Sequence, residues 1–417
     1  MIIYDLLYFL LLLISIPLWG KVLFRKEYRR ILGRRIFPRF APVSPPGIWI
    51  HAVSVGEVRS LDLLIHKLKP LAPSITLSVT TPSGYRYARG KYRQIQVIHA
   101  PLDLSTVIRK YLRRIRPKLL ILNELEVWPN WIALAKKQNV PILLINGRIS
   151  RRAFRMYSLF RFLLIPTFRK IDRFLIQSSF YIEKFRHFRI PDSKIRVTGN
   201  IKADQAADLK NHLTPGPRVF EALKTAPPEK KILVAASTHP ADEEVLFPAL
   251  PDITAGFSVI IVPRHPRRSA RLVMELRKTG ISAVRWSRAQ KIDLDREVLV
   301  YDQIGRLFDI LSIAHRVIMG GTFDEKIGGH NLYEPLALEK PIFGGPFYNN
   351  FPDIGAELTK AGIYRIARDS RQLAEHLHNF SDSGTFQRAA RQIFTRRTGS
   401  VECTLTEIRK ALSRSSC

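Results

Sequence analysis

The sequence predicts an α/β protein with two doubly wound halves, each a parallel sheet covered by helices on both faces. Short, almost wholly apolar runs recur along the chain, and stretches with helical spacing of apolar residues separate them. The alternation pauses in a polar segment at residues 203–217, which contains Pro215, Gly216 and Pro217, and then restarts. We therefore expect a linker there, joining two domains of similar length with a cleft between them.

The composition indicates a globular chain that associates with something anionic. The 417 residues are 46% hydrophobic and 24% charged, and 67 Lys+Arg against 35 Asp+Glu give a formal net charge of +32. Such an excess favours a nucleic acid, an anionic membrane or a phosphorylated substrate as partner. The only cysteines, Cys403 and Cys417, exclude a disulfide framework and a cysteine metal site.

The N-terminus resembles a membrane-attachment segment. Residues 2–19 are apolar except for Asp5, with Pro17 near the end, and a cluster of Lys and Arg follows between residues 21 and 39. Because about 20 apolar residues span a bilayer, the run is marginal for a transmembrane helix, and a helix lying in one leaflet or a buried helix remains an alternative. Adjacent basic residues indicate the cytoplasmic side and attract anionic lipid. We expect a membrane anchor at 1–20 and a basic juxtamembrane segment and linker at 21–46.

The first domain is predicted at residues 47–206. Its strands are expected at 48–51, 75–80, 95–99, 119–123, 142–146, 174–177 and 195–197. Its helices are expected at 58–71, 102–116, 131–137, 152–169 and 180–188.

The second domain is predicted at residues 207–417. Its strands are expected at 232–236, 259–262, 298–301, 317–319 and 342–343. Its helices are expected at 241–247, 269–278, 305–314, 332–338, 354–361 and 373–380, followed by a basic helical tail at 385–416.

Charged residues follow the strands of the first half, at the sheet edge where α/β proteins bind ligands. Glu57 ends the motif His-Ala-Val-Ser-Val-Gly-Glu after the first strand, Glu124 follows the strand at 119–123, and Lys202 follows the last strand. Each has an alternative without function. Ser54-x-x-Glu57 fits a capping box, Glu124 fits a helix start, and a lone lysine is usually at the surface.

The second half carries phosphate-binding patterns. Arg264 lies in Pro-Arg-His-Pro-Arg-Arg directly after a strand, where a guanidinium could pair with phosphate oxygens. The pairs Gly320-Gly321 and Gly328-Gly329 precede a helix start, and Glu334 would face inward if it binds ribose hydroxyls. A solvated basic loop and tight glycine packing remain the alternatives.

Familiar cofactor signatures are absent from the sequence. No G-x-G-x-x-G follows the first strand, and the P-loop, H-E-x-x-H and paired Cys-x-x-Cys patterns do not occur. Asp293-Leu-Asp295 has a metal-binding spacing but lies in a charged loop that we interpret as surface. We expect neither a metal nor a cofactor.

Ordered motifs along nearly the whole chain resemble the 3-deoxy-D-manno-octulosonic acid (Kdo) transferases of lipopolysaccharide assembly. After the apolar anchor come HAVSVGE, TTPSG, ELEVWPN, NGRIS, GNIKAD, STHPADEE, PRHPRR and GGHNLYEP. The resemblance implies a GT-B fold, with two Rossmann-like domains and the reaction in the cleft. It implies inverting, metal-independent transfer of Kdo from CMP-Kdo to a lipid A precursor, lipid IVA, at the cytoplasmic face of the inner membrane.

The resemblance also implies residue roles. Glu57 matches the family's general base, and Glu124 and Lys202 match positions that stabilise the transition state. Three segments match those that bind CMP: Pro263 and Arg264, then Gly305, Arg306 and Leu307, then Asn331, Leu332, Tyr333 and Glu334. The chain departs from the family where Arg306 replaces a frequent glutamate and where Ala241-Asp242-Glu243 replaces Gly-Glu-Glu.

Two other functions are compatible with the sequence. One is a cleft-active transferase that uses another sugar nucleotide, such as a UDP-sugar. The other is a membrane-tethered nucleic-acid-binding protein, suggested by the charge of +32. That class needs exposed aromatics that stack on bases, whereas Phe154, Tyr157 and Phe160 follow helical apolar spacing. We therefore expect an anionic membrane and no nucleic acid as partner.

Overall fold

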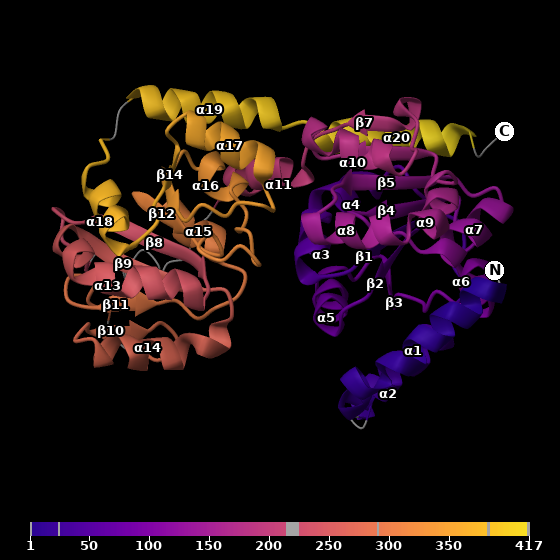
Figure 1. Cartoon of the computed structure of the whole chain (residues 1–417), viewed down its shortest axis with the longest axis horizontal. Helices are drawn as coiled ribbons and strands as arrows, with labels where there is room; N and C mark the ends of the chain where they lie inside the picture. The colour runs from indigo at the N-terminus through magenta and orange to yellow at the C-terminus, as the bar shows by residue number, and fades with distance from the viewer. Residues whose placement is uncertain (1, 24–25, 214–224, 290–291, 382–383, 415–417) are drawn as a thin grey trace. The chain divides into compact units, whose positions relative to one another are not determined.

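The chain folds into two compact α/β units. The computed structural model describes residues 2–23, 26–213, 225–289, 292–381 and 384–414 (Figure 1). Unit 1 comprises Met1–Gln205 and Gly399–Cys417, and unit 2 comprises Ala206–Thr398. The predicted cleft between two domains stays a prediction, and each unit is described by itself.

Unit 1 contains a fully parallel seven-stranded sheet with the order β3-β2-β1-β4-β5-β6-β7. All seven predicted strands are confirmed: β1 (Ile48–Ala52), β2 (Ile75–Val79), β3 (Gln96–His99), β4 (Leu119–Asn123), β5 (Ile142–Gly147), β6 (Arg173–Ile176) and β7 (Ile195–Val197). Every residue of β1, β2, β4 and β5 is buried, as expected for strands covered on both faces. Strands β2 and β3 lie on one side of β1, and β4 to β7 lie on the other, so the strand order reverses between β1 and β4.

Helices cover both faces of this sheet and enclose two apolar clusters. Trp49, Trp131 and Phe168 belong to one cluster, and Ile50 and Leu64 belong to the other. Adjacent residues of β1 thus pack into opposite clusters, because successive side chains of a strand point to opposite faces of the sheet. The helices are α2 (Lys26–Ile36), α3 (Val55–Ser60), α4 (Asp62–Leu68), α5 (Pro82–Lys91), α6 (Ser105–Ile115), α7 (Pro129–Lys137), α8 (Arg151–Leu159), α9 (Arg161–Phe168) and α10 (Ile182–His187), with short η1 (Ser179–Tyr181) and η2 (Asp192–Lys194).

Unit 2 repeats the architecture with a second parallel sheet of the order β10-β11-β9-β8-β12-β13-β14. Its strands are β8 (Lys231–Thr238), β9 (Phe257–Pro263), β10 (Ala283–Arg285), β11 (Val298–Val300), β12 (Arg316–Met319), β13 (Ile342–Gly344) and β14 (Tyr364–Ile366). The five predicted strands are present, and the edge strands β10 and β14 were not predicted. Strands β9 to β11 lie on one side of β8, and β12 to β14 lie on the other, so the strand order reverses between β8 and β12.

The helices of unit 2 follow the predicted pattern. Leu246, Leu250, Leu272 and Leu276 contribute to an apolar cluster that includes residues of the sheet. The helices are α13 (Pro240–Gly256), α14 (Ser269–Lys278), α15 (Leu307–Ser312), α16 (Tyr333–Ala337), α17 (Pro352–Lys360), α18 (Ser370–His378) and α19 (Gly384–Arg397), with short η3 (Pro266–Arg268).

Two boundaries differ from the sequence analysis. The predicted linker at 203–217 begins with helix α11 (Ile201–Asn211), while residues 214–217 lie outside the described residues. The predicted tail breaks at Gly399, whose φ of +97° favours glycine. The second piece, α20 (Ser400–Arg414), belongs to unit 1 and not to the second domain (Figure 1). Asp204 explains this placement, because its carboxylate accepts the N–H groups of Gly399 at 2.6 Å and Val401 at 2.8 Å.

Helix α1 (Ile2–Leu23) covers the predicted anchor. Among the described residues, no helix combines the length and the hydropathy that crossing a bilayer requires. Asp5 Oδ1 accepts hydrogen bonds from Ser105 N at 2.9 Å and Asn130 Nδ2 at 2.6 Å, so the first turn of α1 docks on unit 1. Beyond that turn Leu6, Leu11 and Ile14 are exposed.

Candidate active site

Glu57 lies in the first turn of α3, immediately beyond β1. Half of the predicted capping box is present: Glu57 N donates to Ser54 Oγ at 3.3 Å, but the Glu57 carboxylate bonds the N–H of Val53 and not that of Ser54. Glu57 Oε2 accepts the Val53 N–H at 3.0 Å and Asn123 Nδ2 at 3.3 Å, whereas Oε1 has a longer contact of 3.4 Å with Ser54 Oγ. Val53 and Asn123 therefore hold one oxygen of the carboxylate, which fixes the direction of the other.

Glu124 follows β4, the strand next to β1. Its φ of +58° is unusual for a residue with a side chain, and such strain concentrates at functional sites. Its backbone N–H is held by Ile145 O at 2.9 Å, and its Oε2 accepts from Arg148 Nε at 2.9 Å. The strained turn thus fixes the Glu124 carboxylate against a guanidinium.

The two carboxyl groups are electrostatically unequal. Burial raises the pKa of Glu57 to about 8, and the charges of Glu124 and then Glu126 add to that effect. Burial also opposes ionisation of Glu124, but the nearby Arg148 and Lys202 charges outweigh it and lower the pKa of Glu124. One carboxylate therefore stays ionised while its neighbour exchanges a proton near neutral pH. Environments that separate two pKa values in this way are typical of acid–base sites.

Lys202 is positioned by a chain of buried amides. Its backbone N–H donates to Asn200 Oδ1 at 3.1 Å, and Asn200 Nδ2 donates to Gln177 Oε1 at 3.0 Å. Gln177 Nε2 in turn donates to Asn146 O at 2.9 Å. The first turn of α11 is therefore fixed relative to the ends of β5 and β6, and its lysine contributes positive charge at Glu124.

This cluster lies at the switch point of the first sheet, between β1 and β4. Ligands of doubly wound proteins bind outside the carboxyl ends of the strands at such a point. The second sheet has its own switch point between β8 and β12. There Asp242 accepts the N–H groups of His239 at 2.8 Å and Gly321 at 2.7 Å, which joins the loop after β8 to the glycine loop after β12.

The glycine loop depends on its glycines for two reasons. A Cβ on Gly320 would lie 2.3 Å from Ser237 O, which supports the packing alternative at that position. Gly321, Gly328 and Gly329 have φ values of +72°, +72° and +82°, which side-chain-bearing residues rarely adopt. The predicted role of these glycines as anion donors is not seen, because the N–H groups of all four bond within the chain: to Ala236 O, Asp242 Oδ2, Asp324 O and Gly321 O.

The other predicted binding residues follow the carboxyl ends of three strands in unit 2. Pro263 ends β9 and the exposed Arg264 comes next, while Asn331 Nδ2 donates to Glu334 Oε1 at 3.0 Å at the start of α16. Leu332 and Tyr333 beside them are buried. Gly305 and Leu307 flank Arg306, which is exposed and pairs with Asp309 of its own helix at 2.9 Å.

The sequence profile described as 3-deoxy-D-manno-octulosonic-acid transferase (kdotransferase) matches residues 29–205. A protein of Chlamydia pneumoniae named 3-deoxy-D-manno-octulosonic acid transferase is 32% identical over 367 residues, covering 86% of this chain and 83% of its own. The chain belongs to the Kdo transferase family. It is therefore a glycosyltransferase.

Solved structures place the Kdo transferase fold in a wider group. A UDP-GlcNAc 2-epimerase from Neisseria meningitidis matches with a TM-score of 0.61 at 15% identity, over 87% of this chain and 99% of that one. A glycosyltransferase from Rickettsia africae matches with a TM-score of 0.60 at 15% identity, over 89% of this chain and 99% of that one. These similarities support the GT-B type of the two Rossmann-like units and extend to the fold alone.

Within this Kdo transferase the structure groups Glu57, Glu124 and Lys202 in unit 1, and the predicted CMP segments in unit 2. Sequence reasoning missed Arg148 and Asn123, which bond Glu124 and Glu57. Arg148 belongs to the NGRIS motif quoted above, but no spacing rule links it to Glu124. Among the described residues no group of three or more His, Cys, Asp or Glu is arranged to hold a metal ion.

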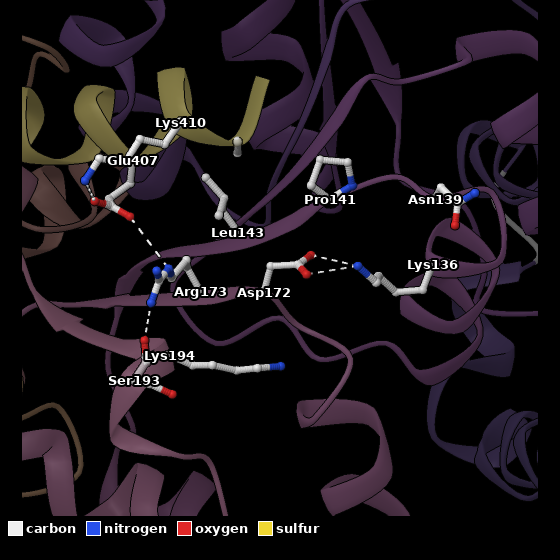
Figure 2. A pocket seen from close by; sticks show the side chains of 11 residues that line it. Lys136, Asn139, Pro141, Leu143, Asp172, Arg173, Ser193, Lys194, Glu407 and Lys410 are labelled. Atoms are coloured by element: carbon white, nitrogen blue, oxygen red, sulfur yellow. Dashed lines mark hydrogen bonds and ion pairs between the residues drawn. The ribbon is translucent and has the colours of Figure 1, made fainter. Parts of the chain in front are cut away.

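A cavity of about 440 Å³ in unit 1 is not this site (Figure 2). It lies at the amino ends of β5 and β6, whereas Glu57 and Glu124 follow carboxyl ends. Its charges pair with one another: Lys136 with Asp172 at 2.9 Å, and Lys410 with Glu407 at 2.9 Å. Because Arg173 and Arg196 also approach Glu407, this network fastens α20 to the sheet.

Proposed function

We propose that this chain transfers Kdo from CMP-Kdo to a hydroxyl of the lipid A precursor lipid IVA, with inversion at the anomeric carbon and Glu57 as general base. The observation that carries the proposal is the Glu57–Glu124 pair in a member of the Kdo transferase family. A catalytic base works best when its pKa lies near the working pH, and the pKa of Glu57, at about 8, meets that condition.

The proton and electron movements fit the residues of unit 1. The acceptor oxygen forms a bond to the anomeric carbon of Kdo while its proton passes to Glu57 Oε1, the oxygen whose contact, with Ser54 Oγ, is the longer one. Glu124 stays ionised beside Arg148 and Lys202, and its negative charge stabilises positive charge developing on the sugar. Lys202 keeps this carboxylate ionised through the transition state.

The leaving group is assigned to unit 2. The bond between the sugar and the phosphate of CMP breaks with its electron pair going to the phosphate oxygen. Arg264 stabilises that charge. Asn331 and Glu334 bind the nucleoside through its ribose hydroxyls. We assign the backbone of Gly305–Leu307 to the CMP site, because the Arg306 side chain is engaged by Asp309.

The acceptor explains the basic excess and the apolar N-terminus. A phosphorylated lipid lies in an anionic membrane, which attracts a chain with a net charge of +32. The exposed apolar side chains of α1 favour contact with that membrane. We therefore propose a location at the cytoplasmic face of the inner membrane, with no nucleic acid as partner.

Product mass spectrometry tests the proposed reaction. Purified protein is incubated with lipid IVA and either CMP-Kdo or a set of UDP-sugars, and the lipid products are weighed. We expect the mass of Kdo to be added only with CMP-Kdo. Transfer from a UDP-sugar in place of CMP-Kdo, or an unmodified lipid with every donor, would contradict the proposal.

A further inference from the structure

Two histidine rings meet at the switch point of the second sheet. His239 follows β8 at the start of α13, and His330 follows the glycine loop after β12. Their rings are nearly parallel, with an interplanar angle of 11° and centroids 5.1 Å apart. Their Nε2 atoms are 2.8 Å apart, which is a hydrogen-bond distance.

This distance restricts the protonation of the pair. A bond between two imidazole nitrogens needs one nitrogen that carries a proton and one that accepts it. Two protons cannot occupy the same gap. The pair therefore holds one shared proton between the rings and, while the contact lasts, carries at most one positive charge.

Basic groups face the pair from the loop after β9. Arg264, His265 and Arg268 face His239 from the loop after β9, with the His265 ring centroid 5.8 Å from that of His239. Burial first, and then these three groups, lower the pKa of His239 to about 4, with Asp324 as the opposing charge.

Two nearby carboxylates have partners of their own. Arg268 is held by the buried Glu243, whose Oε1 accepts from Arg268 Nη1 at 3.0 Å. Asp242 accepts three backbone N–H groups, those of His239, Gly321 and Phe323. Glu243 therefore offsets the charge of Arg268, and Arg264 is the cation that attracts an incoming anion to the pair.

The glycine loop packs against the pair but adds no glycine donors, because the N–H groups of Gly321, Gly328 and Gly329 already bond within the chain. Gly321 lies directly against the pair, because a Cβ built on it would be 3.2 Å from His330 Nε2. Gly328 and Gly329, both with positive φ, immediately precede His330 in the chain. Imidazole N–H groups together with the nearby Arg264 guanidinium are suited to the oxygens of a phosphate.

We propose that His239 and His330 form a proton-sharing imidazole pair that binds the phosphate of the donor nucleotide and takes up a proton as it does so. The inference rests on the proposed function, since it assigns the phosphate of CMP to this pair. The negative charge of the phosphate makes a further proton on the pair favourable. When the phosphate leaves with its nucleotide, the proton is released.

Calorimetry with CMP as the probe tests the pair. The titration is run at about pH 6, above the pKa of about 4 that His239 has without ligand, but within reach of a pair whose pKa a bound anion raises. Binding of the phosphate as a dianion would release protons, so net uptake reports the protein. Repeating it in buffers of different ionisation enthalpy gives the number of protons taken up. We expect uptake with CMP and none with cytidine, which lacks the phosphate.

The variant His330→Asn keeps a hydrogen-bond donor but cannot take up a proton. We expect it to bind CMP roughly tenfold more weakly, the loss of one charge-assisted hydrogen bond, and without proton uptake. His239→Asn should show the same two changes. Agreement between the variants would show that the result does not come from misfolding of one of them. The matched control is His378→Asn, an exposed imidazole beside Phe257 at the amino end of β9, which should bind as the wild type does.

The outcomes separate this inference from the proposed function. If both variants bind CMP and take up a proton as the wild type does, and the wild type transfers Kdo, the inference about the imidazole pair is wrong and the proposed function stands. If the wild type does not bind CMP but binds UMP with proton uptake, CMP-Kdo is excluded as the donor and the phosphate site is supported. Weaker binding of cytidine by the variants would assign the histidines to the nucleoside and also overturn the inference.

Discussion

At the scale of single residues, the central feature is a pair of glutamates whose pKa values shift in opposite directions. Glu57 is half-buried near the Glu124 and Glu126 carboxylates, and burial and these charges raise its pKa to about 8. Glu124 is fixed by a strained backbone against Arg148 and remains charged. The like charge of Glu124 is thus one of the reasons that Glu57 is a stronger base than an ordinary carboxylate.

Glu124→Gln removes this like charge and should lower the pKa of Glu57. A base acts in its ionised form, so wild-type kcat/KM should rise with pH and level off above about 8, the pKa of Glu57. In the variant we expect lower activity and a rise that lies about one pH unit or more further toward acid. The measurement is the pH profile of Kdo transfer for both proteins. A rise at an unchanged pH would remove Glu124 from the control of Glu57.

Sequence reasoning located these acids but not their partners. Glu57 and Glu124 were found because each follows a continuous apolar strand, and parallel strands bring their carboxyl ends to one edge. Arg148 and Asn123 were missed because their bonds depend on the positive φ of Glu124 and on side-chain directions. These arise from tertiary packing, and no local spacing encodes them.

At the scale of elements, strands were easier to predict than helices. Buried parallel strands are uninterrupted apolar runs. The edge strands β10 and β14 have only three residues each, and only the first residue of each is fully buried, so they leave no such run. Helix α5 was missed because Gly84 and Ala88 are its buried residues, so it lacks an apolar face, and Thr81 caps it instead. The predicted helix at 152–169 divides at Phe160 into α8 and α9.

Helix α20 depends on one distant carboxylate. Asp204→Ala leaves the N–H groups of Gly399 and Val401 without their acceptor, and we expect the free energy of unfolding to fall by about 1–2 kcal/mol. Urea denaturation measures this loss. Glu402→Ala is the control on the same helix, because its ion pair with Lys67 is exposed and should contribute less than about 1 kcal/mol. Equal losses in both variants would contradict the role of Asp204.

At the scale of the whole molecule, charge and exposed apolar surface favour the same partner. The net charge of +32 should draw the chain to anionic lipid, and Leu11 and Ile14 on α1 are 65% and 66% exposed. The sequence predicted both features from composition and hydropathy. It did not predict that Asp5 of the apolar helix would bond to Ser105 and Asn130, because that contact spans about a hundred residues of sequence.

Vesicle sedimentation tests this membrane association. We expect binding to vesicles with anionic lipid to weaken as salt is raised, because salt screens exposed charges. The double variant Leu11→Asp, Ile14→Asp should bind less at every salt concentration. Met274→Asp, also an exposed apolar residue and on α14 of unit 2, is the control and should bind nearly as the wild type does. Equal binding by all three proteins would exclude α1 as the contact.

The proton acceptor is tested most directly by Glu57→Gln, which keeps the shape of the side chain and its hydrogen bonds but cannot accept a proton. The measurement pairs kcat for Kdo transfer to lipid IVA with the affinity for CMP in the same preparation. We predict that kcat falls by about 10² to 10⁴, the contribution of a general base, while CMP affinity stays unchanged. Transfer at the wild-type rate would show that another group removes the acceptor proton.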